Sequence, residues 1–193
     1  MISSDFFFTH PNQFYDFYFH EMIYPQAKPN AAHIALAELE KMGICKAVIT
    51  QNIDGLHQAA GSKNVLELHG SVHRNRCLGC HTHYDLAAMI NQKDRVPKCS
   101  KCGHIIKPEV VLYQEALDQS VIQSAVSHIQ SADTLIVGGT SLQVYPAAGL
   151  IQYFHGSQLI LINKSVTDMD YKADLVIHDA IGKVMNEVMT HIM

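Results

Sequence analysis

Two closely spaced cysteine pairs constrain the fold of this 193-residue chain more than any other feature. Cys77 and Cys80 form the first pair, and Cys99 and Cys102 form the second after a gap of eighteen residues. A two-residue spacing lets one tight turn direct two sulfur atoms at the same ion, and four such thiolates are typical of a tetrahedral zinc site. Because four sulfurs leave no open coordination position, the sequence predicts one structural zinc ion in a small module. Four unrelated buried thiols are the less favoured alternative.

Other potential metal ligands lie near the cysteines. His81, His83 and His104 are candidates to replace a thiolate, but the complete set of four sulfurs favours solvent-exposed histidines. Cys45 stands apart, before an aliphatic segment, and we interpret it as a small core residue. Cysteines arranged for a metal, with no disulfide framework, favour a reducing, cytoplasmic environment.

Composition and charge argue against several classes of protein. The chain is 48% hydrophobic and 17% charged, which is typical of a folded globular domain. Its net charge of −4 and its lack of a basic run argue against a nucleic-acid partner. No apolar stretch reaches the roughly 18 residues needed to cross a bilayer, and the N-terminus lacks the features of a secretory signal. We therefore expect neither a nucleic-acid nor a membrane partner.

Short aliphatic segments that end in small polar clusters predict the strands of a sheet. They occupy residues 46–50, 65–68, 134–139, 158–162 and 174–178. Helical patterns occupy residues 11–22, 29–42, 116–130, 146–155 and 181–191. Because strands alternate with helices, the predicted fold class is α/β with a parallel sheet. Ligands bind such sheets beyond the carboxyl ends of the strands, which is where the polar clusters occur.

Three of these polar clusters contain candidate site residues. Gln51, Asn52 and Asp54 follow the first strand, although an ordinary turn explains Asn52 and Asp54 almost as well. His69 ends the second strand, and a neutral imidazole is a natural general base, although most of the thirteen histidines are expected to be structural. Gly-Gly-Thr-Ser at 138–141 precedes a helix, where backbone N–H groups can approach a phosphate or a ribose. The sequence has no Gly-x-Gly-x-x-Gly motif, which argues against an ordinary dinucleotide-binding dehydrogenase.

Six motifs, taken in order, resemble those of the sirtuin family of NAD-dependent protein deacylases. They are TQNIDGLH at 50–57, ELHG at 67–70, the cysteine quartet, KPEVVLYQE at 107–115, GGTSLQVYPAA at 138–148 and LIN at 161–163. The resemblance covers nearly the whole chain. It implies a Rossmann-like parallel sheet domain, formed by residues 1–70 and 105–193, with a four-cysteine zinc module inserted at residues 71–104.

The resemblance also implies where NAD binds. In this family NAD and the acyl-lysine peptide meet in a cleft between the sheet domain and the zinc module. The positions that correspond to the NAD-binding residues are Gln51, Asn52, Ile53, Asp54, Gly139, Thr140, Ser141, Asn163, Ala180 and Ile181. The first four are expected near the ribose and nicotinamide, Thr140 and Ser141 near the phosphates and a ribose, and the last three near the adenosine end.

His69 corresponds to the catalytic histidine of the family. The implied reaction begins when the acyl oxygen attacks C1′ of the nicotinamide ribose and nicotinamide leaves. The histidine then accepts a proton from a ribose hydroxyl, the acyl group passes to ADP-ribose, and the lysine is released. One modest base and the fixed dipoles of a dry cleft suit this chemistry. The zinc ion is accordingly expected to be architectural.

The segment VVLYQE corresponds to the family's peptide-binding stretch. Substrate contacts are expected at Val110, Val111, Leu112 and Tyr113, with Val110 as the main-chain contact for the acyl-lysine. Backbone pairing of this kind adds the peptide as a strand and tolerates many peptide sequences. The family usually has Phe-Gly-Glu where this chain has Tyr-Gln-Glu at 113–115, so the loss of the glycine is expected to crowd the peptide channel.

The start of the chain departs from the family pattern. Sirtuins open with a strand, a glycine-rich loop and a Pro-Asp-Phe-Arg segment that together hold the pyrophosphate and cover nicotinamide. Here the chain starts with the helix that should follow them, so the first strand–loop unit is expected to be missing, either through truncation or with a partner that supplies it. Two interpretations compete: a sirtuin-type deacylase with His69 as base, and a catalytically inactive, zinc-containing peptide-binding remnant. A zinc-ribbon nucleic-acid module is disfavoured by charge.

Overall fold

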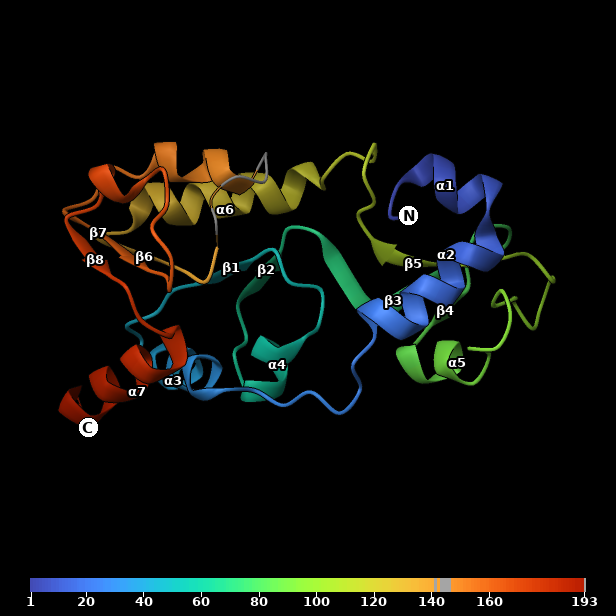
Figure 1. Ribbon diagram of the computed structural model, residues 1–193, viewed down its shortest axis with the longest axis horizontal. Helices are drawn as coiled ribbons and strands as arrows, with labels where there is room; N and C mark the ends of the chain where they lie inside the picture. The colour runs from blue at the N-terminus through green and yellow to red at the C-terminus, as the bar shows by residue number, and fades with distance from the viewer. Residues whose placement is uncertain (141, 143–146, 193) are drawn as a thin grey trace. The chain divides into compact units, whose positions relative to one another are not determined.

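The computed structural model describes residues 1–140, 142 and 147–192 (Figure 1). The chain folds into two compact units, each built from segments that are distant in the sequence. The first unit comprises Met1–Ala27, Thr50–Gly55 and Glu67–Asp118, and the second comprises Lys28–Ile49, Leu56–Leu66 and Gln119–Met193. Residues 71–104, which carry the four cysteines, all lie in the first unit.

Aromatic side chains fill the space between the first helices and the sheet of the first unit. The helices are α1 (Ser4–Thr9), α2 (Pro11–Phe17) and the single π-helical turn η1 (Tyr18–Met22). Phe7, Phe14 and Tyr18 are each 0% exposed, and the rings of Phe7 and Phe14 meet edge to face with centroids 4.9 Å apart. The hydroxyl of Tyr15 donates a hydrogen bond to the carbonyl of Ile106. The single helix predicted for this segment is confirmed as α2 and η1, whereas α1 was not predicted.

The first unit contains a three-stranded antiparallel sheet in the order β4-β3-β5. Its strands are β3 (Gly70–Cys77), β4 (His83–Tyr84) and β5 (Ile106–Val110), and α5 (Leu86–Ile90) follows β4. Along β5, Ile106, Pro108 and Val110 are buried, whereas Lys107 and Glu109 are half-buried. Because side chains alternate between the two faces of a strand, one face of this sheet packs onto the aromatic core.

Strand β3 was not predicted from the sequence. It exposes His73, Arg74 and Arg76 and therefore lacks the aliphatic run that marks the other strands. Its first residue, Gly70, lies opposite Val110 and has a φ of +75°. A Cβ atom at this glycine would lie 2.0 Å from a backbone oxygen of β5, so only glycine lets the two strands approach here.

The second unit contains a parallel sheet in the order β6-β7-β8, as the sequence predicted. Its strands are β6 (Thr134–Gly138), β7 (Gln158–Ile162) and β8 (Leu175–Ile177). On β7, Leu159 and Leu161 pack with Ile151, whereas Ile160 and Ile162 pack against the opposite cluster of helices. A central strand that is buried on both faces has a continuous run of aliphatic residues in its sequence, which explains why this sheet was predictable.

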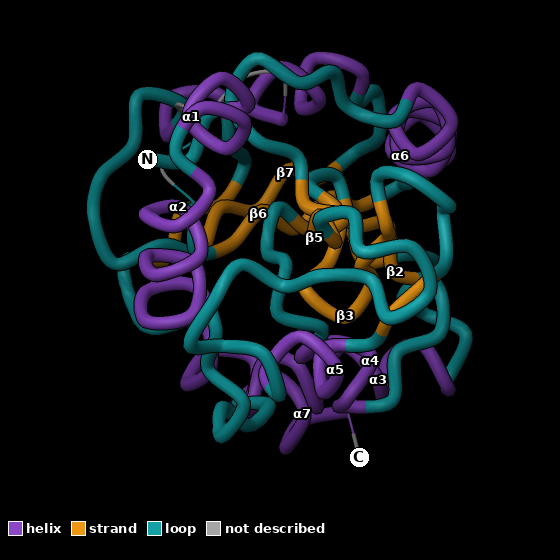
Figure 2. The backbone as a smooth tube through the Cα atoms, turned by 90° about the vertical axis from the view of Figure 1, so that its right-hand side faces the viewer, coloured by secondary structure: helices purple, strands orange, loops and turns teal. Residues whose placement is uncertain are grey.

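Helices cover both faces of the parallel sheet (Figure 1). They are α3 (Ala31–Lys41), α6 (Gln119–Ser131), η2 (Ala147–Tyr153), η3 (Asp170–Lys172) and α7 (Ile181–Ile192). Helix α6 lies over one face, and α3 packs beside α7 on the other, as Figure 2 also shows. The pattern predicted as a helix over 146–155 forms the 3₁₀ helix η2; residues 143–146 lie outside the described part of the chain.

Local sequence signals set the bounds of α3. The side chain of Asn30 accepts hydrogen bonds from the N–H groups of Ala32 and His33, at 2.9 and 3.3 Å. The ring of His33 in turn accepts from the N–H of Asn30 at 3.2 Å, which completes a capping box. The helix ends before Gly43, whose φ is +73°.

A two-stranded sheet pairs β1 (Val48–Thr50) with β2 (Val65–Glu67), and α4 (Leu56–Ala60) lies between them in the sequence. The N–H of Val48 donates to the carbonyl of Asn64 and the N–H of Leu68 donates to the carbonyl of Thr50, both at 2.9 Å. Both strands were predicted from their aliphatic residues. Within the described residues, every helix is too short or too polar to span a bilayer.

Replacing Gly70 with alanine should destabilise the protein by about 3 kcal/mol, because the new methyl group meets backbone and the positive φ becomes strained. Gly103 is a matched control in the same unit, since its φ is +74° and no atom beyond its two chain neighbours lies within 4 Å of the position that a Cβ would occupy. Gly103→Ala should cost only about 1 kcal/mol. Urea unfolding followed by circular dichroism measures both; equal losses would contradict the close approach of β3 and β5.

Candidate functional site

The four cysteines of the two pairs meet at one point of the first unit. The four Sγ atoms all lie within 4.8 Å of one another; they belong to Cys77, Cys80, Cys99 and Cys102. The Sγ atoms of Cys77 and Cys102 are 3.3 Å apart, and those of Cys80 and Cys99 are 3.5 Å apart. The N–H groups of Gly79 and Cys80 both point to the sulfur of Cys77 at 3.4 Å, as expected of a turn that supports a thiolate.

This cluster fits one structural zinc ion. A tetrahedral ion with zinc–sulfur bonds of about 2.3 Å separates its sulfurs by about 3.8 Å, close to the spacing found here. The Tyr84 hydroxyl donates a hydrogen bond to the sulfur of Cys99 at 3.1 Å, which favours the thiolate form of Cys99. Thiolates are the form that a metal ion requires. Four protein ligands close the coordination sphere, so the site is architectural.

The nearby histidines and the fifth cysteine lie outside this sulfur cluster. His81, His83 and His104 are all exposed. Cys45 is half-buried beside α3 and α7 in the second unit, with its sulfur 3.5 Å from the carbonyl of Ala47. Burial raises the pKa of the Cys45 thiol, which makes it less reactive.

His69 lies between β2 and β3 in the first unit. Its Nδ1 atom is 3.1 Å from the carbonyl oxygen of Gln51, and its own carbonyl accepts a hydrogen bond from the N–H of Val111 at 2.9 Å. Because a carbonyl oxygen can only accept, we assign the proton of the neutral ring to Nδ1, which leaves the lone pair on Nε2. The half-buried ring is thus held with one nitrogen ready to accept a proton.

Residues 51–54 form a fixed loop beside this histidine. The carbonyl of Ile53 accepts a hydrogen bond from the N–H of Val72 at 3.0 Å. The carbonyl of Asp54 lies 2.9 Å from Nε2 of His73. Strand β3 therefore supports the loop, and the predicted site residues Gln51 to Asp54 lie in the same unit as His69.

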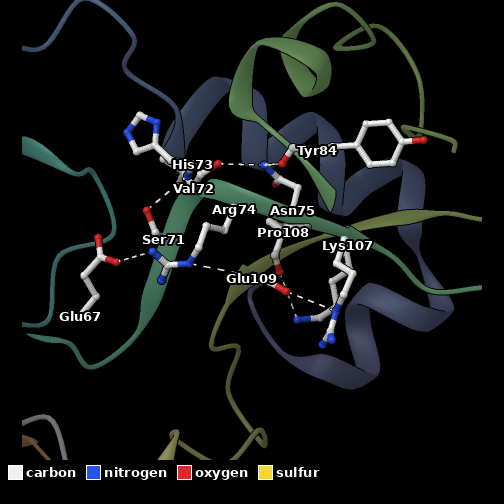
Figure 3. Close-up of polar contacts among 11 residues, drawn as sticks. Glu67, Ser71, Val72, His73, Arg74, Asn75, Tyr84, Lys107, Pro108 and Glu109 are labelled. Carbon is white, nitrogen blue, oxygen red and sulfur yellow. Dashed lines mark hydrogen bonds and ion pairs between the residues drawn. The ribbon is translucent and has the colours of Figure 1, made fainter. Parts of the chain in front are cut away.

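Charged side chains on the exposed face of β3 and β5 form a network (Figure 3). Nη1 of Arg74 is 2.6 Å from a carboxylate oxygen of Glu67, whose side chain is only 8% exposed. Glu109 pairs with Arg74 at 3.9 Å and with Arg76 at 3.2 Å. Because Glu67 is two residues before His69, this network steadies the strand end that carries the histidine. The network was not predicted from the sequence because its members lie on three separate strands.

The predicted peptide-binding segment begins where β5 ends. Val110 and Leu112 are each 3% exposed and belong to the core, whereas Tyr113 is 64% exposed. The carbonyl groups of Leu112 and Tyr113 accept hydrogen bonds from neighbouring backbone N–H groups. Among the described residues, none donates a hydrogen bond to the carbonyl of Val111. The segment thus keeps one backbone acceptor for an added strand.

An ion pair inside the KPEVVLYQE motif shapes this segment. Nζ of Lys107 lies 3.0 Å from Oε2 of Glu115 and 3.3 Å from the carbonyl oxygen of Val110, and the lysine side chain is only 16% exposed. The same Glu115 oxygen accepts a hydrogen bond from the N–H of Leu112 at 3.0 Å. The pair was not predicted, although a lysine and a glutamate that flank a short apolar run are a usable signal in the sequence.

The parallel sheet brings predicted NAD-binding positions of the second unit to one edge. Gly138, Ile162 and Ile177 lie opposite one another in the sheet register, so the residues that follow them share that edge. The N–H of Gly139 donates to the carbonyl of Ile162 at 3.0 Å, and the N–H of Asn163 donates to the carbonyl of Ile177 at 3.1 Å. The polar strand ends of this sheet therefore share one edge, whereas the clusters at 51–54 and at His69 belong to the first unit.

The start of α7 packs against the same edge. A Cβ atom on Gly138 would lie 2.2 Å from Cδ1 of Ile181, so this glycine permits the close approach. The N–H of Ala180 donates to a carboxylate oxygen of Asp179 at 2.7 Å. Thr140 is exposed. Ser141, the remaining predicted residue, lies outside the described part of the chain.

Comparisons with known proteins cover almost the whole chain. The family model described as the Sir2 family matches residues 1–146. A protein of Clostridium acetobutylicum named NAD-dependent protein deacetylase is 60% identical over 189 residues, which are 98% of this chain and 77% of that protein. A protein of the same name from Clostridium perfringens is 62% identical over 190 residues, or 98% of this chain and 78% of the relative.

Solved structures agree with these sequence matches. A structure described as Sir2 with a p53 peptide and NAD⁺ matches with a TM-score of 0.90 at 40% identity, over 99% of this chain and 82% of that one. A structure of Sir2Tm bound to a propionylated peptide matches with a TM-score of 0.91 at 41% identity, over 98% of this chain and 82% of that one.

Replacing Cys77 with serine should lower the zinc content well below one ion per chain and lower the unfolding temperature, because three thiolates hold the ion less tightly. Cys45→Ser is the matched control and should retain one zinc ion. Elemental analysis and calorimetry measure the two effects. A wild-type chain without zinc, or equal zinc contents in the two variants, would contradict the assignment.

Proposed function

The chain belongs to the Sir2 family, and we propose that it is an NAD-dependent protein-lysine deacetylase that transfers the acyl group to ADP-ribose with release of nicotinamide. The observation that carries the proposal is the 60% identity to a protein of that name across 98% of this chain. The geometry around His69 supports it, because a half-buried imidazole with a fixed tautomer is what a single general base requires.

We assign the role of base to Nε2 of His69. The hydrogen bond from Nδ1 to the carbonyl of Gln51 orients the ring, and it stabilises the positive charge that the ring acquires when Nε2 accepts a proton. NAD supplies the ribose that receives the acyl group and the nicotinamide that leaves. The protein must then hold the sugar near Nε2 and exclude water, and we assign this role to residues 51–54, which contact the ring through the Gln51 carbonyl.

The remaining NAD contacts are assigned to the edge of the parallel sheet. Gly139 has a φ of +64° and open space where a side chain would lie, so its backbone is accessible to a ligand. Asn163 follows β7 at the same edge. Ala180 directly precedes α7, which begins at Ile181 and whose first N–H groups favour a negative or polar group. Thr140 and Ser141 complete the proposed set.

The acyl-lysine peptide is assigned to residues 110–113. An extended peptide that donates an N–H to the carbonyl of Val111 would continue the sheet, with the exposed Tyr113 beside it. The buried side chains of Val110 and Leu112 anchor the segment in the core and leave its backbone for recognition.

The alternative of a catalytically inactive peptide-binding remnant is not favoured. Two relatives named as deacetylases are 60% and 62% identical over nearly all of this chain, and the cysteine cluster and His69 are both formed. We also propose a cytoplasmic location, which the cysteine pattern supports. The same pattern supports the proposed division into two domains: a sheet domain of residues 1–70 and 105–193, and a zinc module of residues 71–104.

Incubation of the purified chain with NAD and an acetyl-lysine peptide should yield deacetylated peptide, nicotinamide and acetylated ADP-ribose in equal amounts. Mass spectrometry measures all three. A reaction without NAD is the control and should give no deacetylated peptide. Absence of products at every NAD concentration, with one zinc ion bound, would contradict the proposed activity.

Replacing His69 with alanine should lower kcat at least about 100-fold, the usual contribution of a general base. His69→Asn should be equally inactive, since its amide can still donate to the Gln51 carbonyl but cannot act as a base at neutral pH. His20→Ala removes an exposed histidine of the same unit and should retain wild-type turnover. Turnover by His69→Asn would place the base elsewhere.

A further inference from the structure

Gln114, directly after the proposed peptide-binding segment, adopts a backbone conformation that favours glycine. Its φ is +77°, in the left-handed region that a residue with a Cβ atom rarely occupies. Its side chain is exposed, so core packing does not enforce this conformation. Some other interaction must hold the backbone here.

Asp5 at the start of α1 supplies that interaction. Nε2 of Gln114 donates a hydrogen bond to Oδ2 of Asp5 at 2.8 Å, and Oε1 of Gln114 accepts one from the N–H of Asp5 at 3.2 Å. Both ends of the amide are therefore bound to one residue. We call this pair the Asp5–Gln114 clamp.

The clamp is part of the cap of α1. The first N–H groups of a helix have no partner within it. In α1 the N–H of Ser4 donates to the carbonyl of Tyr113 at 3.0 Å, that of Asp5 donates to Gln114, and that of Phe6 donates to Oγ of Ser3 at 3.3 Å. Two of these three partners belong to residues 113 and 114, so the helix start and the end of the peptide segment hold each other in place.

The neighbouring contacts anchor the rest of the segment but do not fix the sign of φ at Gln114. Glu115 is anchored by Lys107, and the N–H of Tyr113 donates to the carbonyl of Ile2 at 3.0 Å. The N–H of Glu115 also donates to the carbonyl of Leu112 at 3.0 Å, which closes a β-turn with Gln114 at its third position. Such a turn forms with either a negative or a positive φ at this position, and a residue with a Cβ atom prefers the negative φ. A change in the φ of Gln114 would then reorient the carbonyl groups of Val111 and Tyr113.

We propose that Asp5 and Gln114 are positioning residues for the acyl-lysine peptide: the clamp holds Gln114 at positive φ and so presents residues 111–113 in the conformation that accepts the peptide strand. This inference rests on the proposed function, because it assigns a role to the same peptide segment. Neither residue touches the reacting atoms, so the clamp acts on peptide binding and leaves the chemical step to His69.

Three variants test this role. Asp5→Ala removes the carboxylate acceptor, and Gln114→Ala removes both side-chain bonds but keeps the Cβ atom. Asp5→Ala/Gln114→Gly also lacks the clamp, yet glycine adopts positive φ without help. Asp16→Ala, which changes an aspartate of α2 whose side chain is 78% exposed, is the matched control.

The readouts are kcat, the KM for NAD and the KM for an acetyl-lysine peptide. Asp5→Ala should raise the peptide KM about fivefold, the factor that corresponds to one ordinary hydrogen bond, and Gln114→Ala should raise it further. The kcat and the KM for NAD should stay near the wild-type values. The double variant should recover a peptide KM close to wild type. A double variant as impaired as Asp5→Ala, or an Asp5→Ala variant with an unchanged peptide KM, would overturn the proposal.

Hydrogen exchange keeps this proposal separate from the proposed function. The amides of residues 111–113 should exchange faster in Asp5→Ala than in the wild type and slow again in the double variant, with no substrate present. If the wild type showed no deacetylation, the proposed function would fail, while this exchange pattern would still decide whether the clamp holds the segment. Equal exchange in all variants would overturn the clamp itself.

Discussion

The pairing of β3 with β5 is the interaction on which the site of the first unit depends. At one end of the pair Cys77 lies opposite Ile106, beside the other sulfurs, and at the other end Gly70 lies opposite Val110, next to His69. The eight residues of β3 span about 25 Å. The metal cluster and the histidine are thus held by one element although they are far apart. A closed metal site at such a distance makes the fold around the histidine more rigid, but it offers no open coordination position to a substrate.

The sequence could predict those parts of the molecule whose signals are local. The metal cluster followed from spacing because each Cys-x-x-Cys turn closes within four residues, and β6 to β8 followed from aliphatic runs that are buried on both faces. Strand β3 could not be predicted, because three of its eight residues have exposed charged or polar side chains, and its partner β5 lies far along the chain. Helix α1 was missed for a similar reason, since two of its capping partners come from residues 113 and 114.

Candidate site residues were predictable to a different extent in each unit. In the second unit the parallel register alone brings Gly139 and Asn163 to one edge, so the positions follow once the strands are known. In the first unit the identity of His69 as a candidate came from the sequence, but its tautomer did not. Which ring nitrogen carries the proton depends on the Gln51 carbonyl, eighteen residues away, and on a distance that only the folded chain defines.

The capping of α1 has a consequence for synthesis of the protein. The N–H of Asp5 and its partner Gln114 are 109 residues apart in the chain. During translation α1 leaves the ribosome before residues 113 and 114, so its cap is not complete until Gln114, 109 residues beyond Asp5, has been made. Phe7 and Phe14 are fully buried in the folded protein. In the unfinished nascent chain they therefore lack their final packing, and exposed aromatic groups promote aggregation. Chaperone demand for this protein should accordingly concentrate in the interval between the synthesis of α1 and the synthesis of residue 114.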